Sequence, residues 1–167
     1  MAGPRRKDRR TMRDLFPPDL FVQRIYCTTK EEAIGELLNA LVINGLLDLS
    51  REESTLQALL GREKVASTGI GNGVAIPHAK SKFAEKFGVA VGLSEDGIDF
   101  SAHDGRPARV VVLWICPPSA TKEHLALMRA ISSVARDPDL SDRLAGCRDR
   151  RGWLALLDGM PADPKTG

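Results

Sequence analysis

Residues 108–118 of the sequence read ARVVVLWICPP and contain an unbroken apolar run from Val110 to Ile115. Such a run predicts a strand that is buried on both faces, and Pro117 and Pro118 end it because proline cannot continue a strand ladder. A strand buried on both faces needs helices on either side of its sheet. This segment therefore predicts an α/β domain in which helices cover both faces of the sheet.

Helices are predicted both before and after this strand in the sequence. Thr28 and Glu31 have the spacing of a capping box and predict a helix that Asn44–Gly45 closes. Ser50 and Glu53 have the same spacing and predict a second helix that ends near Gly61. Apolar residues at helical spacing predict three further helices, over residues 121–136, 140–145 and 150–157. Shorter strands are predicted over 22–26, 74–76 and 89–93.

Length and composition fit one soluble domain. The chain has 167 residues, of which 43% are hydrophobic and 28% charged. No apolar run reaches the roughly 18 residues of a membrane helix, and the N-terminus lacks the apolar stretch of a signal peptide. We therefore expect a cytoplasmic protein without stable membrane insertion. The cysteines Cys27, Cys116 and Cys147 are odd in number and widely spaced, which predicts neither a disulfide framework nor a cysteine zinc site.

The charge is divided unevenly along the chain. Residues 1–13 carry six basic side chains and one acidic one, whereas the whole chain has a net charge of +2. The remaining residues are therefore net negative, and we expect no nucleic-acid binding by the folded part. The basic segment itself is predicted to be a solvated, disordered tail, with contact to nucleic acid or an anionic membrane as the alternative.

Residues 67–78 read STGIGNGVAIPH, a glycine-rich segment that is unlike the common nucleotide-binding motifs. A dinucleotide fingerprint needs a helix to begin at the glycines, but Val74 and Ile76 lead into Pro77, which a helix interior excludes. A P-loop needs glycine directly before Lys-Ser, whereas Lys80-Ser81 follows alanine. The segment therefore predicts neither kind of nucleotide site.

The same segment ends in a histidine that has the chemistry of a phosphoryl acceptor. His78 follows Pro77, which fixes the local backbone, and it lies behind a glycine loop whose amides could hold an anion. An exposed imidazole is a competent nucleophile toward a phosphoryl group. Alternatively, His78 only fills the end of a strand, and an isolated Pro-His pair favours that interpretation.

Five stretches together resemble one family. They are Arg62–Lys64, 67–78, Ile98–Phe100, Asp104–Pro107 and Glu123–Leu125. They are similar to the type-2 enzyme IIA domains, of fructose/mannitol and nitrogen-regulatory type, of the bacterial phosphoenolpyruvate-dependent phosphotransferase system. The resemblance covers residues 14–158, so 1–13 and 159–167 are expected to be tails. It implies a single α/β domain with a mixed β-sheet sandwiched between helices.

The resemblance also implies a site. His78 would accept a phosphoryl group on Nε2 from the histidine-containing phosphocarrier protein and pass it to an enzyme IIB. Arg62 and His124 fall on the family's active-site arginine and second histidine. The Ser67 or Thr68 hydroxyl and the backbone at Gly71 and Gly73 are expected to add donors to the phosphate. No metal or cofactor is expected, because the three histidines lack a short ligand spacing.

Two functions remain open at this point. The chain is either a phosphocarrier that relays phosphate toward a sugar transporter, or a regulatory binding protein whose targets are chosen by the phosphorylation state of His78. The sequence contains no fused IIB, permease or carrier domain, which favours the nitrogen-regulatory type. The sugar, the partners, the role of the basic tail and the oligomeric state are not encoded in a recognisable motif.

Overall fold

A mixed β-sheet forms the middle of the molecule in the computed structural model, which describes residues 10–162. The strand order is β1-β5-β6-β3-β2, and β4 also pairs with β6. β5 runs antiparallel to β6, whereas β3 and β4 run parallel to it. The strands are β1 (Phe21–Arg24), β2 (Gly69–Gly71), β3 (Val74–Ala75), β4 (His78–Lys80), β5 (Gly88–Ile98) and β6 (Ala108–Cys116).

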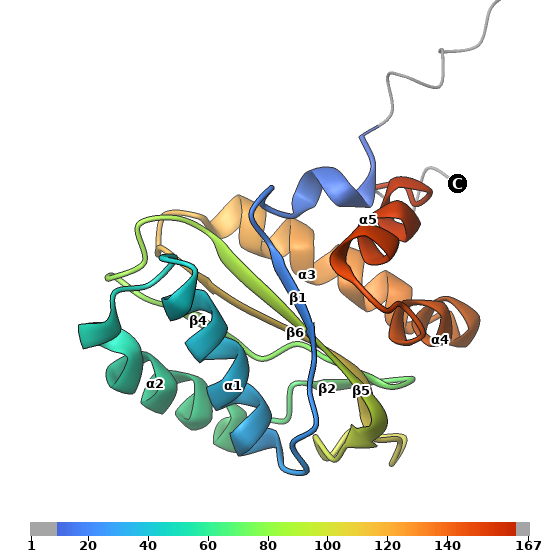
Figure 1. Cartoon of the computed structure of the whole chain (residues 1–167), viewed down its shortest axis with the longest axis horizontal. Coiled ribbons are helices and arrows are strands. Elements are labelled where there is room, and N and C mark those ends of the chain that lie inside the picture. Colours follow the sequence, from blue (N-terminus) through green and yellow to red (C-terminus); the bar gives the residue numbers. More distant parts are fainter. Residues whose placement is uncertain (1–9, 163–167) are drawn as a thin grey trace, which may run out of the picture.

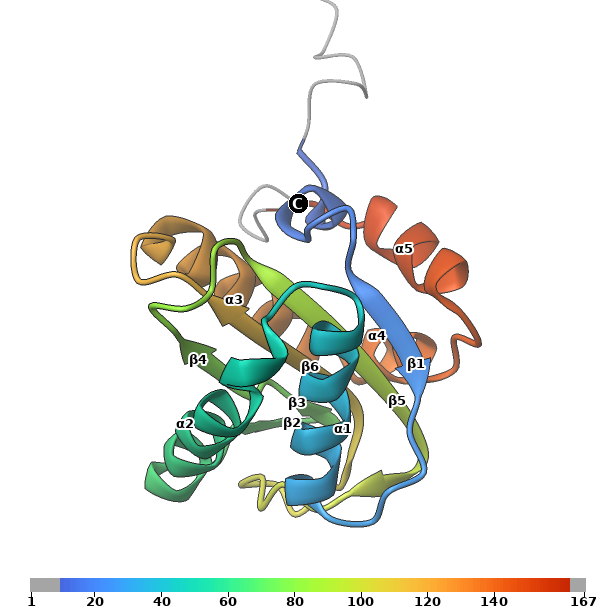
Figure 2. The ribbon, with the colours of Figure 1, turned by 60° about the vertical axis from the view of Figure 1, so that its left-hand side comes forward.

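Helices cover both faces of this sheet, as Figures 1 and 2 show. One face carries α1 (Lys30–Ile43) and α2 (Glu52–Val65), and the other carries α3 (Thr121–Ala135), α4 (Pro138–Ala145) and α5 (Arg150–Asp158). Alternate side chains of β6 enter the two cores: Leu113 packs with α1, and Trp114 with α3. The predicted single α/β domain with a mixed sheet sandwiched between helices is confirmed.

The helix boundaries correct the sequence prediction in detail. The capping box of α1 is formed by Thr29 and Glu32, one residue after the predicted pair. Ser50 caps no helix; Asp48 accepts a hydrogen bond from its amide at 2.8 Å and begins a 3-10 helix, η2 (Leu49–Arg51). α2 continues to Val65, past Gly61. A glycine inside a helix costs only about 1 kcal/mol, which packing offsets.

The glycine-rich segment is a β-hairpin. Asn72 and Gly73 form the two-residue turn between β2 and β3, with φ angles of 49° and 78°. Positive φ at both positions is typical of a type I′ turn, for which Asn-Gly is the preferred pair. Asn72 also donates from Nδ2 to the Ala135 carbonyl at 2.6 Å, which ties the turn to the end of α3.

The two ends of the described chain pack together. Met12 is buried in a 3-10 helix, η1 (Met12–Leu15), and its amide donates to the Met160 carbonyl at 2.8 Å. Arg13 pairs with Asp158 across 2.8 Å. The boundaries expected at residues 13/14 and 158/159 thus fall inside packed segments, while residues 1–9 and 163–167 lie outside the described range. Within residues 10–162, no helix is both long and apolar enough to cross a membrane.

Candidate active site

His78 is the first residue of β4, directly after the break that Pro77 makes in the ladder along β6. Because proline has no N–H to donate, β3 stops at Ala75 and pairing with β6 resumes at His78, opposite Trp114. The Pro77 carbonyl still accepts a hydrogen bond from the Trp114 amide at 3.1 Å. β4 lies between α2 and α3 (Figure 2), and the imidazole of His78 is half-buried.

A backbone carbonyl fixes the neutral tautomer of His78. Its Nδ1 lies 2.7 Å from the carbonyl oxygen of Ile76. A carbonyl can only accept, so Nδ1 carries the hydrogen and donates it. The lone pair of the neutral ring is therefore on Nε2. This is the arrangement that a nucleophilic histidine requires.

His124 lies beside His78 and has the opposite tautomer. It is in the first turn of α3, only 8% exposed, and its ring centroid is 5.2 Å from that of His78. The indole of Trp114 donates from Nε1 to Nδ1 of His124 at 3.0 Å. Since Nδ1 accepts, the neutral His124 ring carries its hydrogen on Nε2. The pair thus offers a lone pair on one ring and an N–H donor on the other.

Both histidines favour the neutral state. Burial lowers the pKa of His78 and the positive charge of Arg62 lowers it further, against the opposing effects of the Ile76 carbonyl and Glu63. Burial also lowers the pKa of His124, and His78 and Lys80 add to this. The lone pair on His78 is therefore available at neutral pH.

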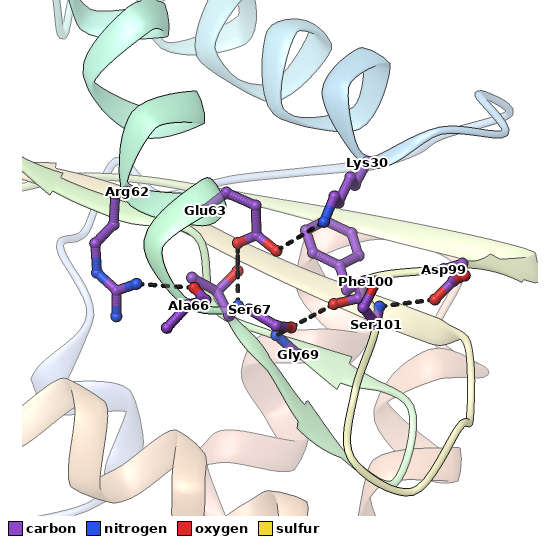
Figure 3. Close-up of polar contacts among 10 residues, drawn as sticks. Lys30, Arg62, Glu63, Ala66, Ser67, Gly69, Asp99, Phe100 and Ser101 are labelled. Atoms are coloured by element: carbon purple, nitrogen blue, oxygen red, sulfur yellow. Dashed lines mark hydrogen bonds and ion pairs between the residues drawn. The ribbon is translucent and has the colours of Figure 1, made fainter.

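Arg62 lies in the last turn of α2, where it caps its own helix. Its Nη1 donates to the Ala66 carbonyl at 2.9 Å (Figure 3). The neighbouring Glu63 is buried, accepts from Thr68 and pairs with Lys30 Nζ at 3.4 Å. The charge of Arg62 thus lowers the pKa of His78, while Nη1 of its guanidinium is bonded to the helix end.

The hydroxyls expected at the phosphate have other partners. Thr68 is buried, and both its amide and its hydroxyl donate to Glu63, at 3.0 Å and 2.5 Å. The Ser67 hydroxyl donates to the Phe100 carbonyl and accepts from the Gly69 amide (Figure 3). These contacts fasten the segment between α2 and β2 to Glu63 and to Phe100, which follows β5, and they leave neither hydroxyl directed to His78.

The glycine loop does not meet His78 either. The Gly73 carbonyl accepts from Val110 at 3.0 Å, whereas His78 is paired with Trp114, four residues further along β6. At about 3.3 Å per residue, the turn lies roughly 13 Å from the histidine along the strand. The expectation that Gly71 and Gly73 cradle the phosphate does not fit this geometry. Their positive φ angles serve the hairpin instead.

Trp114 is the residue of this cluster that the sequence analysis missed. Its indole ring stacks on His78, with centroids 5.0 Å apart and an interplanar angle of 13°. Its place in a strand that is buried on both faces predicts a core residue, yet an indole N–H needs an acceptor when it is buried. That need was the available signal. In the described part of the chain, no three His, Cys, Asp or Glu side chains are grouped to hold a metal ion.

Residues 14–159 match the family model of the phosphoenolpyruvate-dependent sugar phosphotransferase system, EIIA 2. The chain belongs to this family of phosphotransferase components. The resemblance drawn from the sequence motifs is confirmed.

The known relatives include both regulatory and transport proteins. A nitrogen regulatory protein of Bradyrhizobium diazoefficiens is 34% identical over 151 residues, which cover 89% of this chain and 95% of that protein. A PTS system fructose-specific EIIA component of Haloferax volcanii is 39% identical over 116 residues, 70% of this chain and 74% of that one. Enzyme IIAMTL of Escherichia coli, in complex with phosphorylated enzyme IIBMTL, aligns with a TM-score of 0.69 and 27% identity over 84% of this chain and 94% of that one.

Proposed function

We propose that this chain is a phosphocarrier that accepts a phosphoryl group on His78 from the histidine-containing phosphocarrier protein and passes it to an enzyme IIB. The observation that carries the proposal is the pairing of tautomers. Nε2 of His78 has a free lone pair because Nδ1 donates to the Ile76 carbonyl, and His124 has its N–H on Nε2 beside it.

The transfer is a displacement at phosphorus. The Nε2 lone pair of His78 forms the new N–P bond while the N–P bond of the donor histidine breaks and its electron pair returns to the donor nitrogen. Negative charge is spread over three phosphoryl oxygens in a loose transition state, so catalysis depends on position and on hydrogen-bond donors. His124 donates one hydrogen bond to a phosphoryl oxygen from its Nε2. Arg62, on leaving the Ala66 carbonyl, adds a planar fork that matches two oxygens.

The proposal that an enzyme IIB receives the phosphoryl group from this chain is supported by the solved complex of the mannitol relative with phosphorylated enzyme IIB. A regulatory role is favoured by a different observation. The alignment with the Bradyrhizobium nitrogen regulatory protein spans 95% of that protein. In this second function His78 is a switch, because phosphorylation adds up to about two negative charges to the surface and changes which partner binds.

The two functions separate in one assay. The phosphorylated protein is mixed with sugar-specific enzyme IIB domains of the same organism, and phosphate on each protein is followed over time. A relay empties His78 onto one IIB rapidly. A switch keeps its phosphate in the presence of all of them and binds a target protein in only one phosphorylation state.

Incubation with phosphoenolpyruvate, enzyme I and the phosphocarrier protein tests the shared chemistry. We expect wild type to take up acid-labile phosphate and His78→Ala to take up none. His103→Ala is the matched control, because His103 is an exposed loop histidine, and it should be labelled like wild type. Label on His78→Ala with an unchanged thermal melt would overturn the proposal.

A further inference from the structure

We propose that Trp114 is a positioning residue of this site. Its indole N–H holds His124 in the tautomer that donates from Nε2, and its ring face supports the His78 ring when that ring carries a phosphoryl group. The catalytic part of this proposal rests on the proposed function. The part that concerns the tautomer of His124 does not.

The hydrogen bond to His124 permits one neutral arrangement. Trp114 is fully buried near the C-terminal end of β6, and its Nε1 lies 3.0 Å from Nδ1 of His124. An indole has one donor and no acceptor, so only an imidazole lone pair can face it. A hydrogen on Nδ1 of His124, in the other tautomer or in the imidazolium, would leave two donors opposed in a buried place. Trp114 thus keeps the N–H of His124 on Nε2.

The stacking contact acts on His78 directly. His78 and Trp114 are register neighbours on β4 and β6, and their rings are nearly parallel at 13°. When Nε2 of His78 forms the N–P bond, Nδ1 keeps its hydrogen against the Ile76 carbonyl. The imidazole ring therefore becomes positively charged during transfer. The face of an indole attracts a positive charge, so the stack stabilises the phosphorylated ring relative to the free one.

The chain supplies a matched control in its other tryptophan. Trp153 lies in α5, is equally buried and packs edge-on against Phe16 with centroids 5.3 Å apart. Trp153→Phe removes an indole from the core without touching the site. It also leaves Trp114 as the sole indole of the 167-residue chain, because the sequence has two tryptophans.

The tautomers are read first, without any phosphoryl donor. Nitrogen-15 NMR of the histidine rings is recorded against pH for wild type, Trp114→Phe and Trp153→Phe. We expect His124 to have its hydrogen on Nε2 in wild type and Trp153→Phe, and a mixture of tautomers with titration at higher pH in Trp114→Phe. An unchanged tautomer and titration in Trp114→Phe would overturn the proposal.

Single-turnover transfer is measured next. Trp114→Phe should slow transfer from the phosphocarrier protein by roughly tenfold to a hundredfold, as for the loss of a group that orients a reacting one. Trp114→Leu, which also loses the ring face, should be slower still, and Trp153→Phe should match wild type. Equal rates for wild type and Trp114→Phe contradict the proposal. If wild type itself takes up no phosphate, the proposed function fails while the NMR result stands.

A fluorescence experiment keeps Trp114 in place and therefore probes the stacking contact without substituting either of its residues. In Trp153→Phe the emission comes from Trp114 alone. We expect it to fall when His78 is phosphorylated, since a cationic ring stacked on an indole quenches it, and to recover when the phosphate is removed. Emission that does not respond to phosphorylation would show that the stack is absent from the phosphorylated state, and would overturn this half of the proposal.

Discussion

Two histidines with opposite tautomers, held by two different partners, define the candidate site. A carbonyl that can only accept faces Nδ1 of His78, and an indole that can only donate faces Nδ1 of His124. Neither partner is charged, so the assignment of hydrogens needs no ionised group. His78, Arg62 and His124 are predictable from the family motifs, and their catalytic roles stay predictions. The role of Trp114 is not predictable from the sequence, because a strand pattern does not reveal that a buried indole bonds a polar side chain.

Arg62 carries the sharpest prediction at this scale. Arg62→Lys keeps the charge but loses the fork, so single-turnover transfer should slow by roughly tenfold to a thousandfold, the range for loss of one donor to a developing anion. The melting temperature should change little, since lysine also bonds carbonyls at a helix end. Unaltered rates would leave Arg62 with only the capping contact to Ala66, and a collapsed melt would make that contact its main role.

Among the elements, β4 and the β2–β3 hairpin account for the glycine-rich segment. Pro77 interrupts the pairing with β6, which resumes at His78. Asn72 and Gly73 form the turn at the other end of β3. The buried strand predicted from the apolar run Val110 to Ile115 is present, because β6 contains the whole of that run. The predicted phosphate loop does not fit this hairpin, because the sequence alone does not show at which end of β3 the turn lies relative to His78.

Gly73→Ala tests this reassignment. The alanine would have to adopt a φ near 78°, and its Cβ would meet the Pro107 carbonyl at an ordinary 3.6 Å. We expect a loss of about 1–2 kcal/mol in the free energy of unfolding from the left-handed backbone alone. The transfer rate should match wild type. A strongly slowed transfer in a protein that still melts cooperatively would return the hairpin turn to the phosphate site.

At the scale of the whole molecule, the site lies where both helical layers meet the sheet. α2 brings Arg62 from one face, α3 brings His124 from the other, and the β4–β6 pair lies between them (Figure 2). The layers could be predicted from β6 and the helical periodicities. The packing of the two chain ends could not, because the pairing of Met12 with Met160 depends on long-range contacts without a local pattern.

The lowered pKa values of His78 and His124 predict how stability depends on pH. The unfolded chain, with histidine pKa values near 6.5, binds protons before the folded protein does. The contribution of the two neutral histidines to the free energy of unfolding is therefore complete above about pH 6.5 and is lost as the pH falls through the folded pKa values. The loss is at most about 1.4 kcal/mol per pH unit for each histidine. Urea unfolding between about pH 7.5 and about pH 5.5 measures this slope.

A variant assigns this pH dependence to the site. His124→Gln should lose its stability less steeply on acidification than wild type, because one buried titrating group is gone. The same slope in both proteins would mean that His124 does not contribute to this pH dependence.

The central claim is that Nε2 of His78 is the atom that receives the phosphoryl group. Phosphorus-31 and nitrogen-15 NMR of the protein phosphorylated from phosphoenolpyruvate identifies that atom directly. The account predicts one phosphorus signal coupled to Nε2 of His78, with the hydrogen still on Nδ1. Phosphorus bonded to Nδ1 of His78, or to His124, would contradict it.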